Sequence, residues 1–204
     1  DKFFLIFKMK KDNKNNKFIV GIDEVGGGAI AGPLVLGAAA GYLNSKNKKF
    51  LKGIKDSKKL SFNQRLLWFD KFKNSDLDFY CVFISNNFID QYGISKSLKE
   101  GVKRLLKKIN KEIDLVLLDG GLKAPEKYKQ KTIIKGDEKI PFISAASIYA
   151  KVKRDLYMIK LDQRFNYSFS NHKGYRTKKH FLLIKKNGLS KLHRKSFLKN
   201  IVKK

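Results

Sequence analysis

Four acidic residues stand out in a chain that has few acids, because of where they lie relative to the predicted strands and helices. Asp23 and Glu24 end the first strand, Asp119 ends the fourth, and Asp155 lies on a helix predicted over 142–161. Carboxylates at the ends of neighbouring strands converge, and converging oxygens suit hard divalent ions such as Mg²⁺ or Mn²⁺. Successive strand residues face opposite ways, so we expect the strand to end at the glycines that follow, which lets Asp23 and Glu24 reach one site. Solvated loop carboxylates or helix caps are the alternative interpretation.

Three consecutive glycines, Gly26, Gly27 and Gly28, follow the first acidic pair. They fit the loose G-x-G-x-x-G/A pattern of dinucleotide-binding loops, but that pattern needs a helix, and Gly32-Pro33 followed by a strand-like run prevents one. We favour a loop whose bare backbone approaches a ligand and whose amides bind a hydroxyl or a phosphate. A plain flexible turn is the alternative.

Lysine and serine residues supply further candidates for substrate binding. Lys58 lies just before a predicted helix start, where it could bind a phosphate or simply be solvated. Ser147, Lys151 and Asp155 are four residues apart and therefore share roughly one helix face. The alternative for Lys151 is an intrahelical ion pair with Asp155.

A basic loop near the C-terminus contains an aromatic residue. Lys173 and Tyr175 lie in the run His172-Lys173-Gly174-Tyr175, and such a tyrosine suits stacking on a base or a sugar. Neither a Ser–His–Asp nor a Cys–His arrangement is supported. The histidines lack metal-ligand spacing, and we expect them to contact phosphate or to lie at the surface: His172, His180 and His193.

The charge of the chain favours a polyanionic partner. Its 204 residues include 46 Lys and Arg against 18 Asp and Glu, a formal charge of +28, and lysines gain affinity near phosphates by releasing counterions. Because 40 of the basic residues are lysine, a compositional bias of the source genome is the alternative.

Composition also excludes several classes of protein. The hydrophobic content of 42% excludes the interpretation that the whole chain is a disordered basic tail. The single cysteine, Cys81, excludes a disulfide framework, and no apolar run approaches the ~20 residues of a membrane span, so we expect a cytoplasmic protein.

The candidate residues must be positioned by a mixed α/β sheet. Apolar and β-prone runs predict five strands, and Ser61 and Pro141 are helix-start signals. Strands that cluster early and then alternate with helices indicate this class. The predicted strands span 18–23, 34–43, 79–84, 115–118 and 132–134, and the main predicted helices span 62–73, 95–111 and 142–161.

The two ends of the chain differ in composition from the middle. We expect residues 1–17 to be a flexible lead-in and 18–204 to form one domain, with a core over about 18–162. Residues 163–204 contain no Asp or Glu and thirteen Lys and Arg, which predicts a basic helical appendage. Helical patterns occur there near 177–186 and 195–203.

Seven segments, taken in order, resemble ribonuclease HII, the type 2 branch of the ribonuclease H family. They are GIDEVGGGAIAGPLV at 21–35, DSKKLS at 56–61, LLDG at 117–120, KGD at 135–137, SAASIYAKVKRD at 144–155, HKGYRTKKH at 172–180 and LHRKSF at 192–197. The resemblance implies a ribonuclease H-like mixed β-sheet flanked by helices. It also implies four metal-binding and catalytic carboxylates: Asp23, Glu24, Asp119 and Asp155.

The same resemblance implies an activity and its ligands. The enzyme would cut the RNA strand of RNA–DNA hybrids, and would cut 5′ to ribonucleotides embedded in duplex DNA, leaving 3′-hydroxyl and 5′-phosphate ends, as in ribonucleotide excision repair. Two Mn²⁺ or Mg²⁺ ions would serve the reaction, and the protein would be a monomer, with a sliding-clamp contact left open. The loop at 26–28 would sense the ribose 2′-hydroxyl, and Tyr175 would pack beside the scissile junction.

Two departures from the family pattern bear on substrate recognition. Gly27 stands where the family usually has a basic residue, and Arg176 ends a run that usually ends in glycine. Two other classes of function stay open at this point. One is a non-catalytic nucleic-acid-binding protein, which metal-dependent cleavage would exclude; the other is a related metal nuclease such as a junction resolvase, which would cut without a ribonucleotide.

Overall fold

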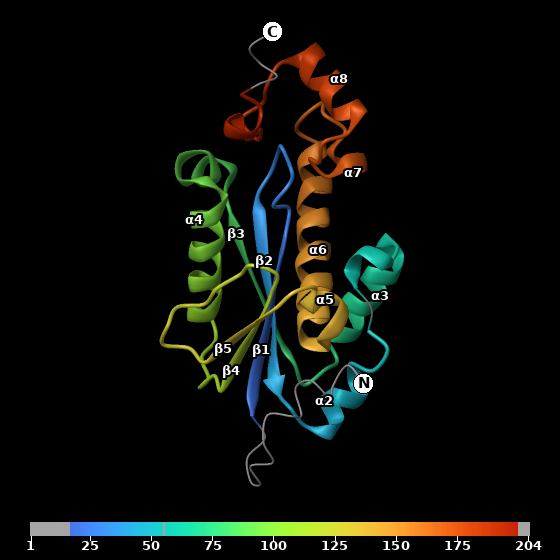
Figure 1. Cartoon of the computed structure of the whole chain (residues 1–204). Coiled ribbons are helices and arrows are strands. Elements are labelled where there is room, and N and C mark those ends of the chain that lie inside the picture. Colours follow the sequence, from blue (N-terminus) through green and yellow to red (C-terminus); the bar gives the residue numbers. More distant parts are fainter. Residues whose placement is uncertain (1–16, 55, 200–204) are drawn as a thin grey trace.

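The computed structural model describes residues 17–54 and 56–199, which form a five-stranded mixed sheet with helices on both faces (Figure 1). The strand order is β3-β2-β1-β4-β5. The first three strands pair antiparallel, whereas β4 is parallel to β1 and β5 is parallel to β4. The strands are β1 (Phe18–Val25), β2 (Leu34–Tyr42), β3 (Asp78–Ile84), β4 (Leu115–Asp119) and β5 (Gln130–Ile133).

Two long helices cover the sheet, α6 on one face and α4 on the other (Figure 1). The shorter helices lie around the rims and at the C-terminal end. The helices are α2 (Ser45–Phe50), α3 (Phe62–Phe72), α4 (Asn86–Lys107), α5 (Gly136–Lys139), α6 (Pro141–Asp162), α7 (Phe169–His172) and α8 (Lys178–Asn187), with 3₁₀ turns η1 (Ser57–Lys59) and η2 (Lys195–Phe197).

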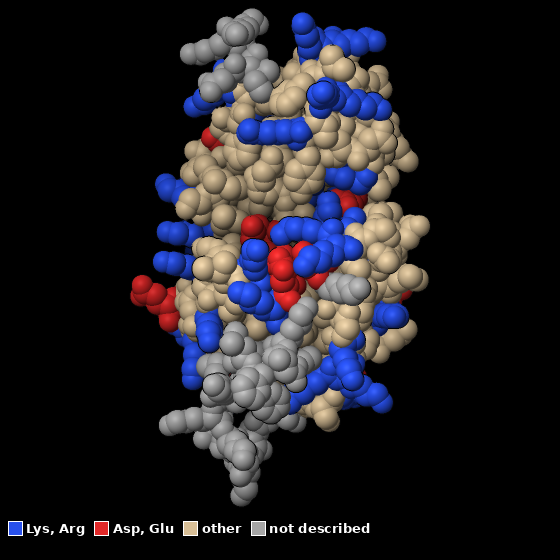
Figure 2. Space-filling model, turned by 45° about the vertical axis from the view of Figure 1, so that its right-hand side comes forward, with Lys and Arg blue, Asp and Glu red and all other residues tan. Residues whose placement is uncertain are grey.

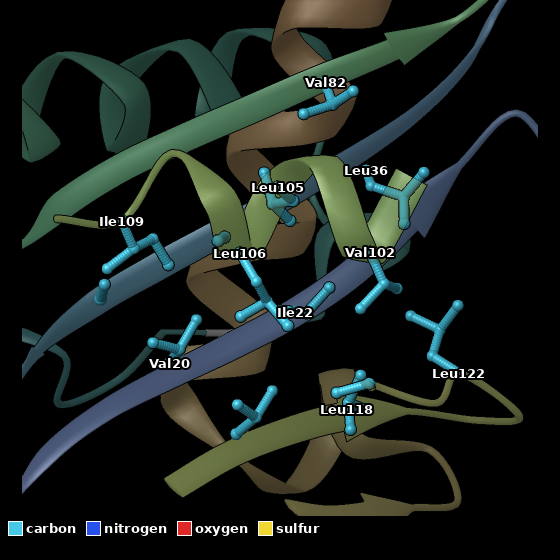
Figure 3. Packing of buried hydrophobic residues seen from close by; sticks show 14 of the residues in the cluster. Val20, Ile22, Leu36, Val82, Val102, Leu105, Leu106, Ile109, Leu118 and Leu122 are labelled. Carbon is cyan, nitrogen blue, oxygen red and sulfur yellow. The ribbon is translucent and has the colours of Figure 1, made fainter. Parts of the chain in front are cut away.

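The alternation of strand side chains divides the core into two layers. In β1, Val20 and Ile22 pack toward α4, with Leu105 and Leu106 of that helix (Figure 3), and Ile19 packs toward α6. On the α6 face the helix approaches very closely, since a Cβ at Gly37 would lie 2.6 Å from the carbonyl oxygen of Ala146. This close contact holds the α6 face rigidly against the sheet end that carries Asp23.

The predicted start signals are confirmed. Ser61 caps α3 in a capping box with Gln64, and Pro141 occupies the first turn of α6. The helix predicted over 95–111 begins earlier, because a further helical segment precedes Gly93 and the non-helical backbone of that glycine (φ 77°) joins the two into the kinked α4. The helical pattern at 195–203 forms only the turn η2, and its residues 200–203 lie outside the described part.

The C-terminal part is joined to the sheet by a small apolar core of its own. Tyr167, Phe169, Ile184 and Leu198 pack there with Ile30 and Ala31, which follow the glycine loop, and with Met158 of α6. Because the segment shares this core with the loop after β1, its position and that of the loop depend on each other. Within the described ranges, no helix has both the length and the apolar character that a bilayer crossing requires.

The expectation that the histidines contact phosphate or lie at the surface is wrong, because all three are buried. The backbone N–H of Ser190 donates to Nδ1 of His193, whose Nε2 lies 3.1 Å from Nε2 of His180, and Nδ1 of His180 lies 2.9 Å from the carbonyl oxygen of Tyr175. This chain of contacts assigns one proton to each ring: His193 Nε2–H donates to His180, and His180 Nδ1–H donates to Tyr175. The His172 ring stacks on the His180 ring with centroids 4.1 Å apart. His180 and His193 are therefore neutral, and His172 Nδ1 accepts the N–H of Gly174, so the three rings together hold the Tyr175 turn.

The histidine cluster predicts that acid destabilises the protein. Burial, together with the smaller effect of the neighbouring His172 and His193, lowers the pKa of His180 from 6.5 to about 4. Between pH 4 and 6.5 the unfolded chain binds more protons at this position than the folded one, so the stability that His180 contributes is complete above pH 6.5 and is lost as the pH falls toward 4. At pH 5 the loss amounts to about 2 kcal/mol.

The measurement is the free energy of urea unfolding at pH 7.5 and pH 5, compared between the wild type and His180→Asn. Asparagine can still donate to the Tyr175 carbonyl but does not titrate. The comparison is needed because the carboxyl groups of Asp23 and Glu24 have raised pKa values and shift stability in the opposite direction. If both proteins show the same difference between the two pH values, His180 does not titrate as described.

Candidate active site

Asp23 and Asp119 come together because β1 and β4 are parallel neighbours. Ile22 pairs with Leu118, so the next residue of each strand is an aspartate on the face that α6 covers. Asp137, on α5, joins them: one carboxylate oxygen from each of Asp23, Asp119 and Asp137 lies within 4.8 Å of the others. Two of the sequence-predicted carboxylates are therefore brought together, with a third that was not predicted.

Asp137 is placed by a tight turn and by hydrogen bonds to its surroundings. Lys135, just before α5, has the left-handed φ of 56°. The Gly136 N–H donates to Asp119 Oδ1 at 2.5 Å, and Ser144 Oγ donates to the Asp137 carbonyl at 2.6 Å. The aspartate of the KGD segment was the available sequence signal, but no periodicity indicated that α5 would lie beside β4.

Glu24 lies beside this group. Both Asp23 and Glu24 belong to β1, which continues to Val25, two residues beyond its predicted end at Asp23. The strand therefore does not end before Glu24 as expected, and Glu24, like Asp155, contributes no oxygen to the group of three found among the described residues. The Glu24 N–H donates to Asp23 Oδ1 at 2.8 Å. Burial, followed by the charge of Asp119, raises the pKa of Glu24 to about 7.

The Asp155 carboxylate is paired with two basic side chains. Its Oδ1 lies 2.8 Å from Lys151 Nζ and its Oδ2 lies 3.8 Å from Nη2 of Arg65 on α3. The carboxylate is buried, and it is absent from the group of three oxygens found among the described residues. The intrahelical ion pair between Lys151 and Asp155, considered above as the alternative, is formed.

The carboxylate group is surrounded by polar and basic side chains that the sequence had indicated. Lys58 Nζ lies 3.0 Å from Asp137 Oδ2. Ser147 is buried, and its Oγ lies 2.8 Å from Ser57 Oγ. Burial raises the pKa of Asp23 well above its usual value, the charge of Glu24 raises it further, and a hydrogen bond from Ser147 opposes the rise. Crowded acids with raised pKa values mark a place where a cation would be favoured.

The glycine loop and the Tyr175 turn lie against each other beside α6. The backbone N–H groups of Ile30 and Ala31 both donate to the Gly174 carbonyl, at 2.9 and 3.2 Å. The Tyr175 ring lies 5.3 Å from Lys151 Nζ and 5.1 Å from Arg154 Cζ. Figure 2 shows acidic side chains at the middle of this face with lysine and arginine side chains around them. Such a face can hold cations at its centre and polyanion phosphates around them.

A family model described as Ribonuclease HII matches residues 20–200 of the chain. The chain belongs to the ribonuclease HII family. As a member of this family, it is an endoribonuclease, a hydrolase of the type 2 ribonuclease H class.

Bacterial members of the family match this chain in sequence over nearly its whole length. Over 198 residues it is 38% identical to the ribonuclease HII of Clostridioides difficile (strain 630), covering 97% of this chain and 76% of that protein. It is 36% identical over 204 residues to that of Caldicellulosiruptor bescii, covering 99% and 97%. With the Prochlorococcus marinus (strain MIT 9312) protein it shares 44% identity over 183 residues, 88% of each.

Solved structures have the same fold. The ribonuclease H2 of Pyrococcus horikoshii OT3 matches with a TM-score of 0.74 at 25% identity, covering 91% of this chain and 97% of that one. The RNase HII of Archaeoglobus fulgidus, solved in a complex with PCNA, matches with a TM-score of 0.72 at 25% identity, covering 90% and 94%. A Bst-RNase HIII solved with Mn²⁺ matches with a TM-score of 0.61 at 18% identity, covering 94% and 72%.

Proposed function

We propose that Asp23, Glu24, Asp119 and Asp137 hold two divalent cations, Mg²⁺ or Mn²⁺, and that this site hydrolyses RNA. The observation that carries the proposal is the approach of three carboxylate oxygens to within 4.8 Å at a largely buried position. Oxygen donors of this kind suit hard cations, and a bound cation would offset the burial and the neighbouring negative charges that raise the pKa values of Asp23 and Glu24. Asp137 thus takes the ligand role that the resemblance placed on Asp155.

When bound, such ions neutralise charge on the scissile phosphate and make a water molecule nucleophilic near neutral pH. The chain's own residues supply the geometry. Gly136 orients the Asp119 carboxylate through its N–H, and the Ser147 hydroxyl favours the charged form of Asp23. Lys58 is more than half exposed and bonded to Asp137, so it can turn toward a substrate phosphate when a cation takes its place.

Asp155 then has a positioning role in this site. It holds Lys151 on the α6 face, where the ammonium group faces the Tyr175 ring. Lys151 and Lys173 would contact phosphates on either side of Tyr175, and Tyr175 would pack beside the scissile junction. In this arrangement Asp155 acts on the substrate only through Lys151.

For the substrate we propose RNA–DNA hybrid and duplex DNA with embedded ribonucleotides, cut 5′ to the ribonucleotide. The 2′-hydroxyl is the group that separates RNA from DNA, and the loop at Gly26, Gly27 and Gly28 lies next in the chain to Asp23 and Glu24, where it could sense that group. We also propose that the protein acts as a monomer in the cytoplasm in ribonucleotide excision. A sliding-clamp contact is a further proposal, supported by the PCNA complex of the Archaeoglobus fulgidus protein.

The test is incubation with duplex DNA that carries one ribonucleotide, alongside the same duplex without it. We expect cleavage of the first duplex only, 5′ to the ribonucleotide, with a 3′-hydroxyl end, and complete loss of cleavage with EDTA. Cleavage of both duplexes would instead indicate a nuclease of the junction-resolvase kind. Binding without metal-dependent cleavage would indicate a non-catalytic nucleic-acid-binding protein.

A further inference from the structure

Two arginines without any exposed surface, Arg154 and Arg194, lie beneath the loop that follows β1. Arg154, on α6, donates from Nε to the Pro33 carbonyl at 2.9 Å, from Nη2 to the Ala31 carbonyl at 3.3 Å, and from Nη1 to the Lys173 carbonyl at 3.0 Å. The same guanidinium therefore holds the end of the glycine loop and the turn that carries Tyr175.

Arg194 reaches the loop from the C-terminal segment. Its Nε donates to the Gly32 carbonyl at 3.0 Å and its Nη1 to the Gly27 carbonyl at 3.1 Å. Its backbone N–H donates to the Ile30 carbonyl at 2.8 Å. These bonds hold the segment from Gly27 to Gly32 in place.

The bond to Gly27 determines the direction of an amide. A trans peptide group is planar, so the C=O of Gly27 and the N–H of Gly28 point in opposite directions. Arg194 holds that carbonyl inward, and the Gly28 N–H is consequently turned outward at an exposed residue. An outward N–H in the loop that directly follows Asp23, Glu24 and Val25 is suited to a hydroxyl or phosphate oxygen.

Neither guanidinium has a carboxylate within 4.0 Å in the described part of the chain, and Nη2 of Arg194 is buried without a hydrogen-bond partner. Buried charge without a counter-charge is costly, and its field is poorly screened by solvent. The Arg194 charge lies directly under Gly27, the position at which the chain has no basic side chain, and the Arg154 guanidinium lies against Gly26.

We propose that Arg194 is a positioning residue that holds the Gly28 N–H outward, and that Arg194 and Arg154 supply, from beneath the loop, the positive charge absent at Gly27. The anion that they attract is the substrate phosphate beside the ribonucleotide. This inference rests on the proposed function, and it predicts that a basic residue at position 27 is redundant while Arg194 is present.

The test uses the full chain with Arg194→Met, Arg194→Lys, Gly27→Arg and the Arg194→Met/Gly27→Arg double variant. Gly27 can accept a side chain, because a Cβ there meets nothing within 4 Å and its φ is ordinary. Arg164→Met, at an exposed arginine of the C-terminal part, is the matched control. The readouts are Kd and KM against kcat on the single-ribonucleotide duplex, Mn²⁺ affinity, and the melting temperature.

For Arg194→Met we expect Kd and KM to rise at least tenfold with little change in kcat or Mn²⁺ affinity, and for Arg194→Lys a smaller rise. Gly27→Arg should tighten binding less than threefold in the wild type but restore most of the loss in Arg194→Met. The inference would be overturned if Gly27→Arg lowered Kd by the same factor in the wild type and in Arg194→Met. It would also be overturned if Arg194→Met bound the duplex with the Kd of the wild type. If Arg194→Met does not fold, a tenfold lower Kd of Gly27→Arg for the duplex, compared with the wild type, still overturns the inference. A wild type that cleaves no ribonucleotide would instead count against the proposed function.

Discussion

Replacing Asp137 by asparagine is expected to reduce cleavage by at least about a hundredfold while leaving the fold intact. An amide keeps the size of the side chain but removes a negative oxygen from the group formed with Asp23 and Asp119. Metal-supplied charge stabilisation amounts to several kcal/mol, and each 1.36 kcal/mol is tenfold in rate. The melting temperature should change little, because removing repulsion among the crowded acids offsets the loss of the ion pair with the exposed Lys58.

The matched variant is Asp155→Asn, which is expected to act mainly on stability. It leaves Lys151 and Arg65 without their shared buried partner, and removing one member of a buried ion pair costs about 3–5 kcal/mol. Below its melting temperature this variant should keep its Mn²⁺ affinity and more kcat than Asp137→Asn, with a raised KM. The measurements are kcat and KM on a hybrid, Mn²⁺ titration and thermal melting. Loss of metal binding in Asp155→Asn with normal binding in Asp137→Asn would return the ligand role to Asp155.

Replacing Gly26 by alanine is expected to be severe, whereas the same change at Gly27 is expected to be mild. Gly26 has φ +90°, and a Cβ built on it would lie 2.8 Å from Cζ and 2.9 Å from Cδ of Arg154, and closer still to Nε. A left-handed backbone conformation costs a non-glycine residue about 1–2 kcal/mol, and displacing a buried guanidinium adds to this. We expect Gly26→Ala to lower the melting temperature clearly and to raise KM on the single-ribonucleotide duplex at least tenfold.

Gly27→Ala provides the control, because it changes the same loop by the same methyl group. With open space around it and an ordinary φ, it should change stability by no more than about 0.5–1 kcal/mol, in the stabilising direction if at all. Urea unfolding and steady-state kinetics on both variants make the comparison. Similar losses in both would show that the loop requires glycine for flexibility and not for room above Arg154.

Local patterns were sufficient for most of the architecture. The apolar runs at the strands, the N-cap at Ser61 and the proline at 141 depend on neighbouring residues only, since periodicity and capping are properties of short segments. The ordered motifs likewise led to the ribonuclease HII family, and the ends of β1 and β4 were correctly expected to bring Asp23 and Asp119 together.

The tertiary structure decided which other residues join them. Asp155 shares a helix face with Ser147, but α3 places Arg65 against it, whereas the turn after β5 delivers Asp137 beside Asp119. The interior histidines and the arginines under the glycine loop likewise took their roles from how separate segments pack, as Arg194 and Gly27 illustrate. Spacing along one helix or strand predicts which residues share a face. The partner that a charged side chain meets there depends on how distant elements pack. This packing is the reason that Asp137 lies with Asp23 and Asp119, whereas Asp155 is paired with Lys151 and Arg65.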